Sequence, residues 1–257
     1  MRISSILFAA PALAATSAMA EPTVEISTGL EYQEGEYGTG ESIETWSVPI
    51  SVRVPSGQVI LSATLPYLRV DAPGNVVGGG GGLLGLPIIV DPTEPPDRVR
   101  REGIGDLELG AAYMVPSDDI GLTLSGQVKV PTASTAKGLG TGEMDYAVGA
   151  EVSKTFGRVT PFVGVGYTMP GDPDNFELDN SLSARAGAAV RMSERVRGHV
   201  AYGYAQSVSP LVPDEQQVSA GVNAGLSERL SLGLYGSAGL SEGSPDVGAG
   251  LRLGTSF

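Results

Sequence analysis

The sequence has 257 residues, of which 29 are acidic and 16 are Lys or Arg, and its formal net charge of −13 disfavours nucleic acid as a partner. It contains no Cys, which excludes disulfides, thiolate metal sites and a Cys nucleophile. No uninterrupted apolar run approaches the roughly 18 to 20 residues of a membrane-spanning helix, so a membrane protein with this sequence must cross the bilayer as strands.

The beginning of the sequence has the pattern of a secretory signal peptide. Arg2 is followed by a short apolar run from Ile6, and the small-residue sequence Ala18-Met19-Ala20 closes the segment. An amphipathic helix is the alternative, but the segment has no acidic residue and no polar face. We therefore predict a signal peptide over residues 1–20 and an exported domain over residues 21–257.

Most of the remaining sequence alternates large apolar residues with Gly, Ser or a charged residue. The C-terminal stretch "VGAGLRLGTSF" (247–257) has apolar side chains on one face and Gly, Ser and Arg on the other. Similar segments recur along the chain, each about as long as the 9 to 11 residues of a tilted membrane strand. About twelve strands are predicted, over residues 23–33, 42–54, 58–70, 103–115, 120–130, 143–155, 158–168, 179–192, 196–206, 218–226, 230–240 and 247–257.

Tight turns and longer loops alternate between these segments. Turns such as "PSGQ" (55–58) and "PSDD" (116–119) alternate with Gly-, Pro- and acid-rich loops such as "MPGDPDNFE" (169–177). A soluble β-sandwich is the alternative, but its polar face would be rich in Lys, Glu and Thr, whereas Gly, Ser and Ala predominate here. We therefore predict an all-β fold, a transmembrane antiparallel up-and-down β-barrel in a bacterial outer membrane, with short periplasmic turns and long external loops.

The sequence ends inside the last predicted strand, at Phe257. A barrel allows this because its last strand pairs with its first and leaves no open edge in lipid. A terminal Phe after alternating apolar residues also resembles the signal that hands outer-membrane proteins to their assembly machinery. The expected partners are therefore that machinery and the lipid and lipopolysaccharide of the outer membrane. Aromatic residues share the outward parity, as in a membrane-interface girdle: Tyr32, Trp46, Tyr67, Tyr113, Tyr146, Tyr167, Tyr202 and Tyr204.

Three stretches in the middle of the sequence resemble a known family. They are "EGIGDLELGAAY" (102–113), "VKVPTASTAKGLGTGEMDYAVGAEVSKTFG" (128–157) and "PFVGVGYTMPG" (161–171). They are similar to the outer-membrane transporters found with meta-pathway phenol and cresol degradation. The resemblance implies an outer-membrane barrel with a transport role, and it suggests an aromatic solute.

Strand parity predicts which charged residues face the barrel interior. Acids predominate on the first half of the sheet, and guanidinium groups on the second half. Two interpretations stay open: opposed charged walls orient or select a solute, as charged rings do in pores, or the charges pair across a closed lumen and hold the barrel together. The candidate lumen-lining residues are Glu108, Glu151, Arg185, Arg197, His199 and Arg252.

These features favour a channel or transporter for small solutes, hydrophobic or aromatic solutes among them. A structural or surface-binding barrel with a closed lumen is the alternative, and acidic external loops would then bind divalent cations or bridge to lipopolysaccharide through them. A lipid-modifying enzyme is disfavoured because the single His, His199, faces inward without an outward Ser partner. No catalytic residue, metal or cofactor is therefore expected.

One apolar segment departs from the family pattern. The stretch "NVVGGGGGLLGLPIIV" (75–90) lies inside a loop of Pro and charged residues, and its five successive Gly residues disfavour a rigid strand. Exposed apolar residues in such a loop need a reason. We expect the loop to fold over or into the external mouth as a constriction, or else to pack on the barrel rim or dip into the outer leaflet. Its candidate constriction residues are Leu83, Leu84, Leu86, Ile88 and Ile89.

Overall fold

The computed structural model describes residues 24–38, 40–77, 88–89, 97–174 and 177–257. The predicted signal peptide lies outside these residues. The strands are β1 (Glu25–Gly35), β2 (Ile43–Ser56), β3 (Val59–Pro73), β4 (Val76–Val77), β5 (Ile88–Ile89), β6 (Arg98–Ile104), β7 (Leu107–Val115), β8 (Gly121–Val130), β9 (Asp145–Ser153), β10 (Val159–Met169), β11 (Ser181–Arg191), β12 (Val196–Ala205), β13 (Glu215–Gly225), β14 (Leu230–Gly239) and β15 (Val247–Ser256). Among the described residues, no helix is long and apolar enough to cross a bilayer.

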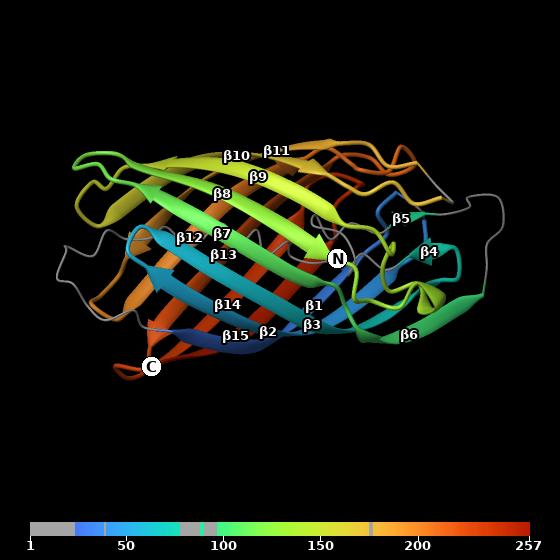
Figure 1. The fold of residues 1–257 in the computed structure, drawn as a ribbon, viewed down its shortest axis with the longest axis horizontal. Coiled ribbons are helices and arrows are strands. Elements are labelled where there is room, and N and C mark those ends of the chain that lie inside the picture. The colour runs from blue at the N-terminus through green and yellow to red at the C-terminus, as the bar shows by residue number, and fades with distance from the viewer. Residues whose placement is uncertain (1–23, 39, 78–87, 90–96, 175–176) are drawn as a thin grey trace.

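The strands close into an antiparallel barrel (Figure 1). Apart from β4 and β5, which pair with each other outside the wall, each wall strand pairs with the wall strands next to it along the chain, and β1 pairs with β15 from Glu25 opposite Ser256 to Glu34 opposite Val247. Because β6 and β7 both pair with β3 and share one position, the wall has twelve strands. The chain can therefore end inside a strand: the Phe257 amide donates to the Val24 carbonyl oxygen at 3.0 Å. The predicted twelve-stranded barrel is confirmed.

The outward faces of the barrel carry exposed apolar side chains. Ile50, Val163 and Leu251 are 58%, 59% and 41% exposed, although each lies within a paired strand. Of the predicted girdle, Trp46 and Tyr32 pack against each other with ring centroids 4.7 Å apart. An apolar surface of this extent requires an apolar surrounding, and a lipid bilayer provides it.

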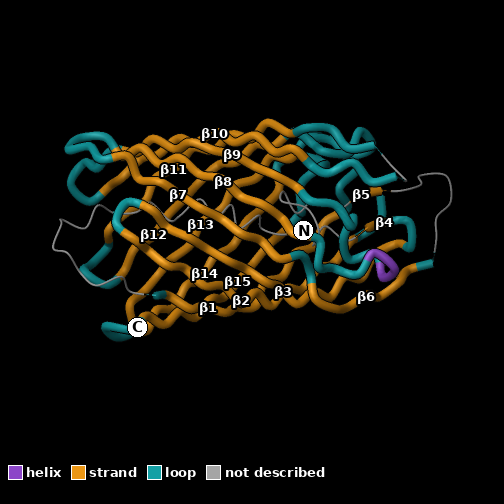
Figure 2. Tube along the Cα trace, viewed as in Figure 1, coloured by secondary structure: helices purple, strands orange, loops and turns teal. Residues whose placement is uncertain are grey.

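Tight turns connect the strands at one end of the barrel, and longer loops connect them at the other. Figure 2 shows the loops gathered at these two ends, with the 3₁₀ helix Thr135–Lys137 among those near β6. We call them the tight-turn end and the long-loop end. The C-terminus lies at the tight-turn end, opposite β4, β5 and β6 (Figure 1).

One wall strand is interrupted, which the alternation did not predict. The predicted strand 103–115 begins at Arg98 and breaks at Gly105 and Asp106 into β6 and β7. The Gly105 amide donates to the Pro66 carbonyl oxygen at 2.8 Å. A Cβ atom on Gly105 would lie 2.8 Å from Pro66 Cγ, so only Gly allows β3 and the strand break to approach so closely.

Candidate functional site: the barrel interior

The interior of the barrel alternates Gly with large polar side chains across neighbouring strands, not only along each strand. Two rows of register partners have this pattern. One row contains Glu151, Gly164, Arg185, Gly203, Gln217 and Gly239 on β9 to β14. The other contains His199, Gly221, Tyr235, Gly250 and Glu31 on β12 to β15 and β1.

Several of the interior Gly residues provide the space in which a neighbouring side chain lies flat against the wall. A Cβ atom on Gly221 would be 2.5 Å from His199 Cε1, and one on Gly187 would be 2.6 Å from Phe162 Cζ. Gly250 lies in the same way beneath the Tyr235 ring. The Gly residues inside the barrel therefore position its large polar residues along the wall.

The interior charges form ion pairs along the wall. Arg185 on β11 reaches over Gly164 on β10 and donates a hydrogen bond to Glu151 on β9. The Arg185 guanidinium also lies 5.1 Å from the Phe162 ring centroid, which is cation–π geometry. Arg252 pairs with Glu31 at 3.4 Å. The two predicted charged walls thus meet through Glu151 and Arg185.

The other predicted interior residues lie at separate places. His199 on β12 faces the barrel interior and is half-buried over Gly221. Glu108 is half-buried on β7 with Lys129 and Thr64 as register partners. Arg197, by contrast, is exposed at the tight-turn end of β12.

A buried charged cluster lies at the long-loop end; strand parity predicts that Asp106, Lys129 and Asp145 face inward, but they were not among the candidate lumen-lining residues. Lys129 Nζ lies 2.9 Å from Asp145 Oδ2 and 3.7 Å from Asp106 Oδ2, and none of the three side chains is more than 4% exposed. Lys129 also donates to Thr141 Oγ1, and Asp106 accepts from the Ala133 amide at 2.8 Å. The cluster thereby joins the strand break to the loop after β8. All five residues lie in the motif stretches of the family resemblance, which is the sequence signal that points to them.

The long-loop end is partly filled by a hydrophobic cluster. Burial holds the pKa of the Tyr37 hydroxyl well above its usual range, with smaller contributions from Glu215 and Asp246, so this side chain stays neutral. The cluster joins residues of β2, β3 and β4 to loop residues: Tyr37, Ile43, Leu68, Val70, Ala72, Val76, Ala133, Leu139 and Val212. It narrows the barrel at this end.

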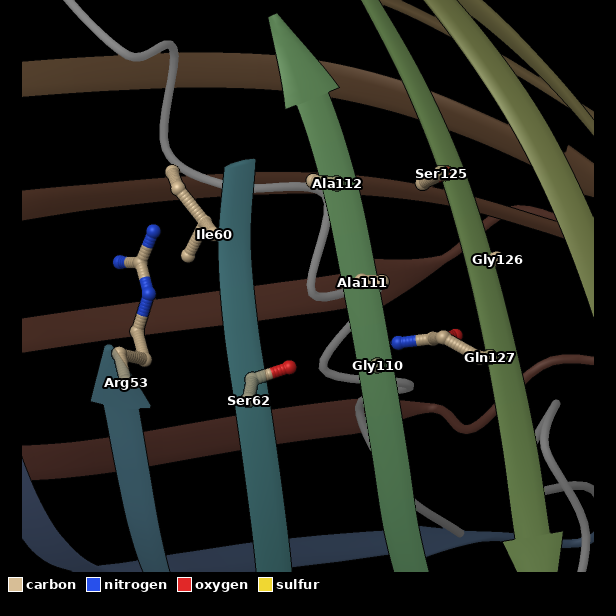
Figure 3. A pocket seen from close by; sticks show the side chains of 9 residues that line it. All are labelled: Arg53, Ile60, Ser62, Gly110, Ala111, Ala112, Ser125, Gly126 and Gln127. Carbon is tan, nitrogen blue, oxygen red and sulfur yellow. The ribbon is translucent and has the colours of Figure 1, made fainter. Parts of the chain in front are cut away.

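A small hollow of about 20 Å³, partly open to solvent, lies against the wall of β2, β3, β7 and β8. Figure 3 shows Ser62, Gly110 and Gln127 on neighbouring strands, with Arg53 beside them. The interior wall formed by β3, β7 and β8 thus presents small residues here, unlike the strands on which Arg185, His199 and Tyr235 lie. The hollow is lined by Arg53, Ile60, Ser62, Gly110, Ala111, Ala112, Ser125, Gly126 and Gln127.

Most of the predicted constriction segment lies outside the described residues, including Leu83, Leu84 and Leu86. The backbones of Ile88 and Ile89 form β5, which pairs with Val77 and Val76 of β4. Arg101 holds the start of this loop by donating to the carbonyl oxygens of Pro73, Gly74 and Val76. In the described part of the chain, no group of three or more His, Asp and Glu side chains could hold a metal ion.

The closed barrel, its lipid-compatible surface and its polar interior define a transmembrane β-barrel of the outer-membrane kind. Among solved structures, the COG4313 outer membrane channel from Pseudomonas putida F1 is similar, with a TM-score of 0.73 and 15% identity over 94% of this chain and 97% of that one. The KdgM porin has a TM-score of 0.57 and 7% identity, covering 91% and 99% of the two chains. The translocator domain of the autotransporter NalP from Neisseria meningitidis has a TM-score of 0.54 and 12% identity, over 94% of this chain and 90% of that one.

Residues 34–257 match the family described as putative MetA-pathway of phenol degradation, and the chain belongs to that family. The predicted resemblance is confirmed. A search of the curated proteins found no match.

Proposed function

We propose that the protein is a channel, not an enzyme, through which small solutes cross the bacterial outer membrane. The observation that carries this proposal is the hollow beside the small-residue wall of a closed barrel. Porins and an autotransporter translocator share this architecture, so the fold by itself does not select a function. Membership of a phenol-degradation family supports an aromatic solute.

The solute path follows the small-residue wall of β3, β7 and β8. Ser62, Gly110 and Ser125 leave space on this side, whereas Arg185, His199 and Tyr235 lie flat on the opposite strands. Of the predicted lumen residues, Arg185 and His199 then line the opposite side of the path and present hydrogen-bond donors to it, whereas Glu108 lies on β7 itself. We propose that the constriction segment with Leu83, Leu84, Leu86, Ile88 and Ile89 narrows the external mouth above this path.

Single-channel conductance and uptake of phenol by proteoliposomes test the channel. A Ser125→Trp substitution places a large side chain at the hollow and should lower both quantities. Leu124→Trp is the matched control, because Leu124 faces lipid and is 46% exposed. If the wild-type barrel neither conducts nor takes up phenol, the closed structural or surface-binding barrel is the better interpretation.

We further propose the partners and processing that such a channel needs: removal of residues 1–20, assembly through Phe257, and lipopolysaccharide around the long-loop end. Phe257 supports the assembly role because it is 69% exposed at the end of β15. Deleting Phe257 should lower the amount of folded barrel in the outer membrane. The mass of the mature chain should be that of a chain that begins at Glu21. Unchanged assembly without Phe257 would remove that part of the proposal.

A further inference from the structure

Three exposed arginines at the tight-turn end have no carboxylate partner among the residues that the structure describes. Inside the barrel, the ion pairs of the described residues engage Arg53, Lys129, Arg185 and Arg252. Within the same described ranges, Arg158, Arg191 and Arg197 form no ion pair, and Arg191 makes a single side-chain hydrogen bond, to the Gly157 carbonyl oxygen at 3.4 Å. At the same end Asp119 pairs with Lys154 at 2.7 Å, and Glu194, exposed in the turn between Arg191 and Arg197, forms no ion pair with any described residue.

The strand register brings these three arginines together. Arg191 on β11 and Arg197 on β12 are direct Cα partners. The Arg191 amide donates to the Arg158 carbonyl oxygen at 2.8 Å, which places Arg158 as the next member of the same row. Like charges opposite each other on neighbouring strands destabilise a sheet. An anion bound between them would remove that repulsion.

The same row continues around the barrel with further donors. Arg197 is the register partner of Asn223 on β13, and Asn223 is the partner of Gly233 on β14, followed by Arg252 on β15. Arg191 and Arg197 have the inward parity of their strands and lie beside the tight turns, so they face the barrel interior and not the lipid, whereas Arg252 lies in the middle of β15. A guanidinium group has only hydrogen-bond donors and binds a carboxylate through two parallel hydrogen bonds.

We propose that Arg158, Arg191 and Arg197 form a binding site for a small organic carboxylate at the tight-turn end of the barrel. The site rests on the proposed channel function, which places it at the periplasmic opening, and it extends the solute class from neutral to anionic molecules. The ligand is held by charge-assisted hydrogen bonds in an opening that water also fills. Binding is therefore weakened by added salt.

Equilibrium dialysis of benzoate against the detergent-solubilised full-length barrel tests the site. Benzyl alcohol is the matched ligand control, because it has a similar size and no charge. Substituting Arg158, Arg191 and Arg197 together by Gln should weaken benzoate binding by about tenfold, as expected for three exposed charge pairs. Arg229→Gln is the control variant, since Arg229 lies in another turn at the same end, outside the row.

The outcomes separate this site from the channel proposal. Benzoate binding that is lost in the triple variant and kept in Arg229→Gln supports the site, even if the barrel fails to conduct. Equal benzoate binding by the wild type and the triple variant overturns it, and so does a wild type that binds benzyl alcohol as strongly as benzoate. Unchanged migration of each folded variant in a semi-native gel shows that loss of binding is not loss of the barrel.

Discussion

Gly250 lies beneath the Tyr235 ring, and this contact explains at the scale of single residues why Gly occupies so many interior positions. Along each strand the alternation predicted small inward residues. It did not predict that each Gly would lie beside a large residue on a neighbouring strand, because that relation depends on the register between strands. The Glu151 and Arg185 ion pair over Gly164 is the clearest case.

Adding one methyl group at this position should therefore destabilise the barrel. Gly250→Ala forces the Tyr235 ring away from the wall, and overpacking of this kind costs about 1–3 kcal/mol in the free energy of unfolding. Urea unfolding in micelles, followed by the fluorescence of Trp46, the single Trp, measures the change. Gly126→Ala is the control, because the nearest atom to its added Cβ, the Ala147 carbonyl oxygen, is 3.9 Å away. Equal losses from both substitutions would contradict the space-filling role of Gly250.

At the scale of strands, the sequence pattern predicted which face of each strand is apolar, because period-two alternation needs no knowledge of the partner strand. β8 shows this with neighbouring residues: Leu124 is 46% exposed on the outer face, and Ser125 lines the interior hollow. The pattern did not predict the break between β6 and β7. That break depends on contacts of Gly105 with Pro66 and of Asp106 with the Ala133 amide, which are distant in sequence.

Arginine substitutions at these two neighbours distinguish the faces. Leu124→Arg should lower the free energy of unfolding by about 2–4 kcal/mol if the residue lies near the bilayer midplane. Ser125→Arg keeps its charge in the interior, so it should fold and change only conductance. Urea titration in lipid vesicles measures the first effect and planar-bilayer recording the second. A similar loss of folded barrel from both would mean that the faces are reversed.

The loop between β4 and β5 is the element on which the proposed constriction depends. Because Val77 and Ile88 are register partners, residues 78–87 can be replaced by Asn-Gly, which forms a two-residue hairpin turn. A constriction predicts a larger conductance and less selective phenol uptake after this replacement. A Gly/Ser segment of the original length is the control that removes Leu83, Leu84 and Leu86 without shortening the loop. Unchanged conductance in both variants would leave the segment as rim packing.

At the scale of the whole molecule, the even strand number and the alternation of tight turns with longer loops were predictable, because both follow from the spacing of apolar segments. The filling of the long-loop end was not, since Tyr37, Leu139 and Val212 come from three separate loops that only the closed barrel brings together. The two ends consequently differ: the long-loop end holds a hydrophobic cluster, and the tight-turn end has Arg191 and Arg197 side by side on neighbouring strands. Because of this difference, the two ends of the barrel can be told apart, although antiparallel strands alone would not distinguish them.

The last prediction concerns which end of the barrel faces the cell exterior. Barrels of this type have short periplasmic turns and longer external loops, so the long-loop end should face the cell exterior. The chain has no Cys of its own, so a single Cys introduced at Asp172 or Ser117 reports on one position only. Both residues are exposed, Asp172 in a long loop and Ser117 in a tight turn. A membrane-impermeant maleimide applied to whole cells should label Asp172→Cys and not Ser117→Cys, and both should be labelled once the outer membrane is permeabilised. Labelling of Ser117→Cys alone on intact cells would reverse the orientation and place the arginine site at the cell surface.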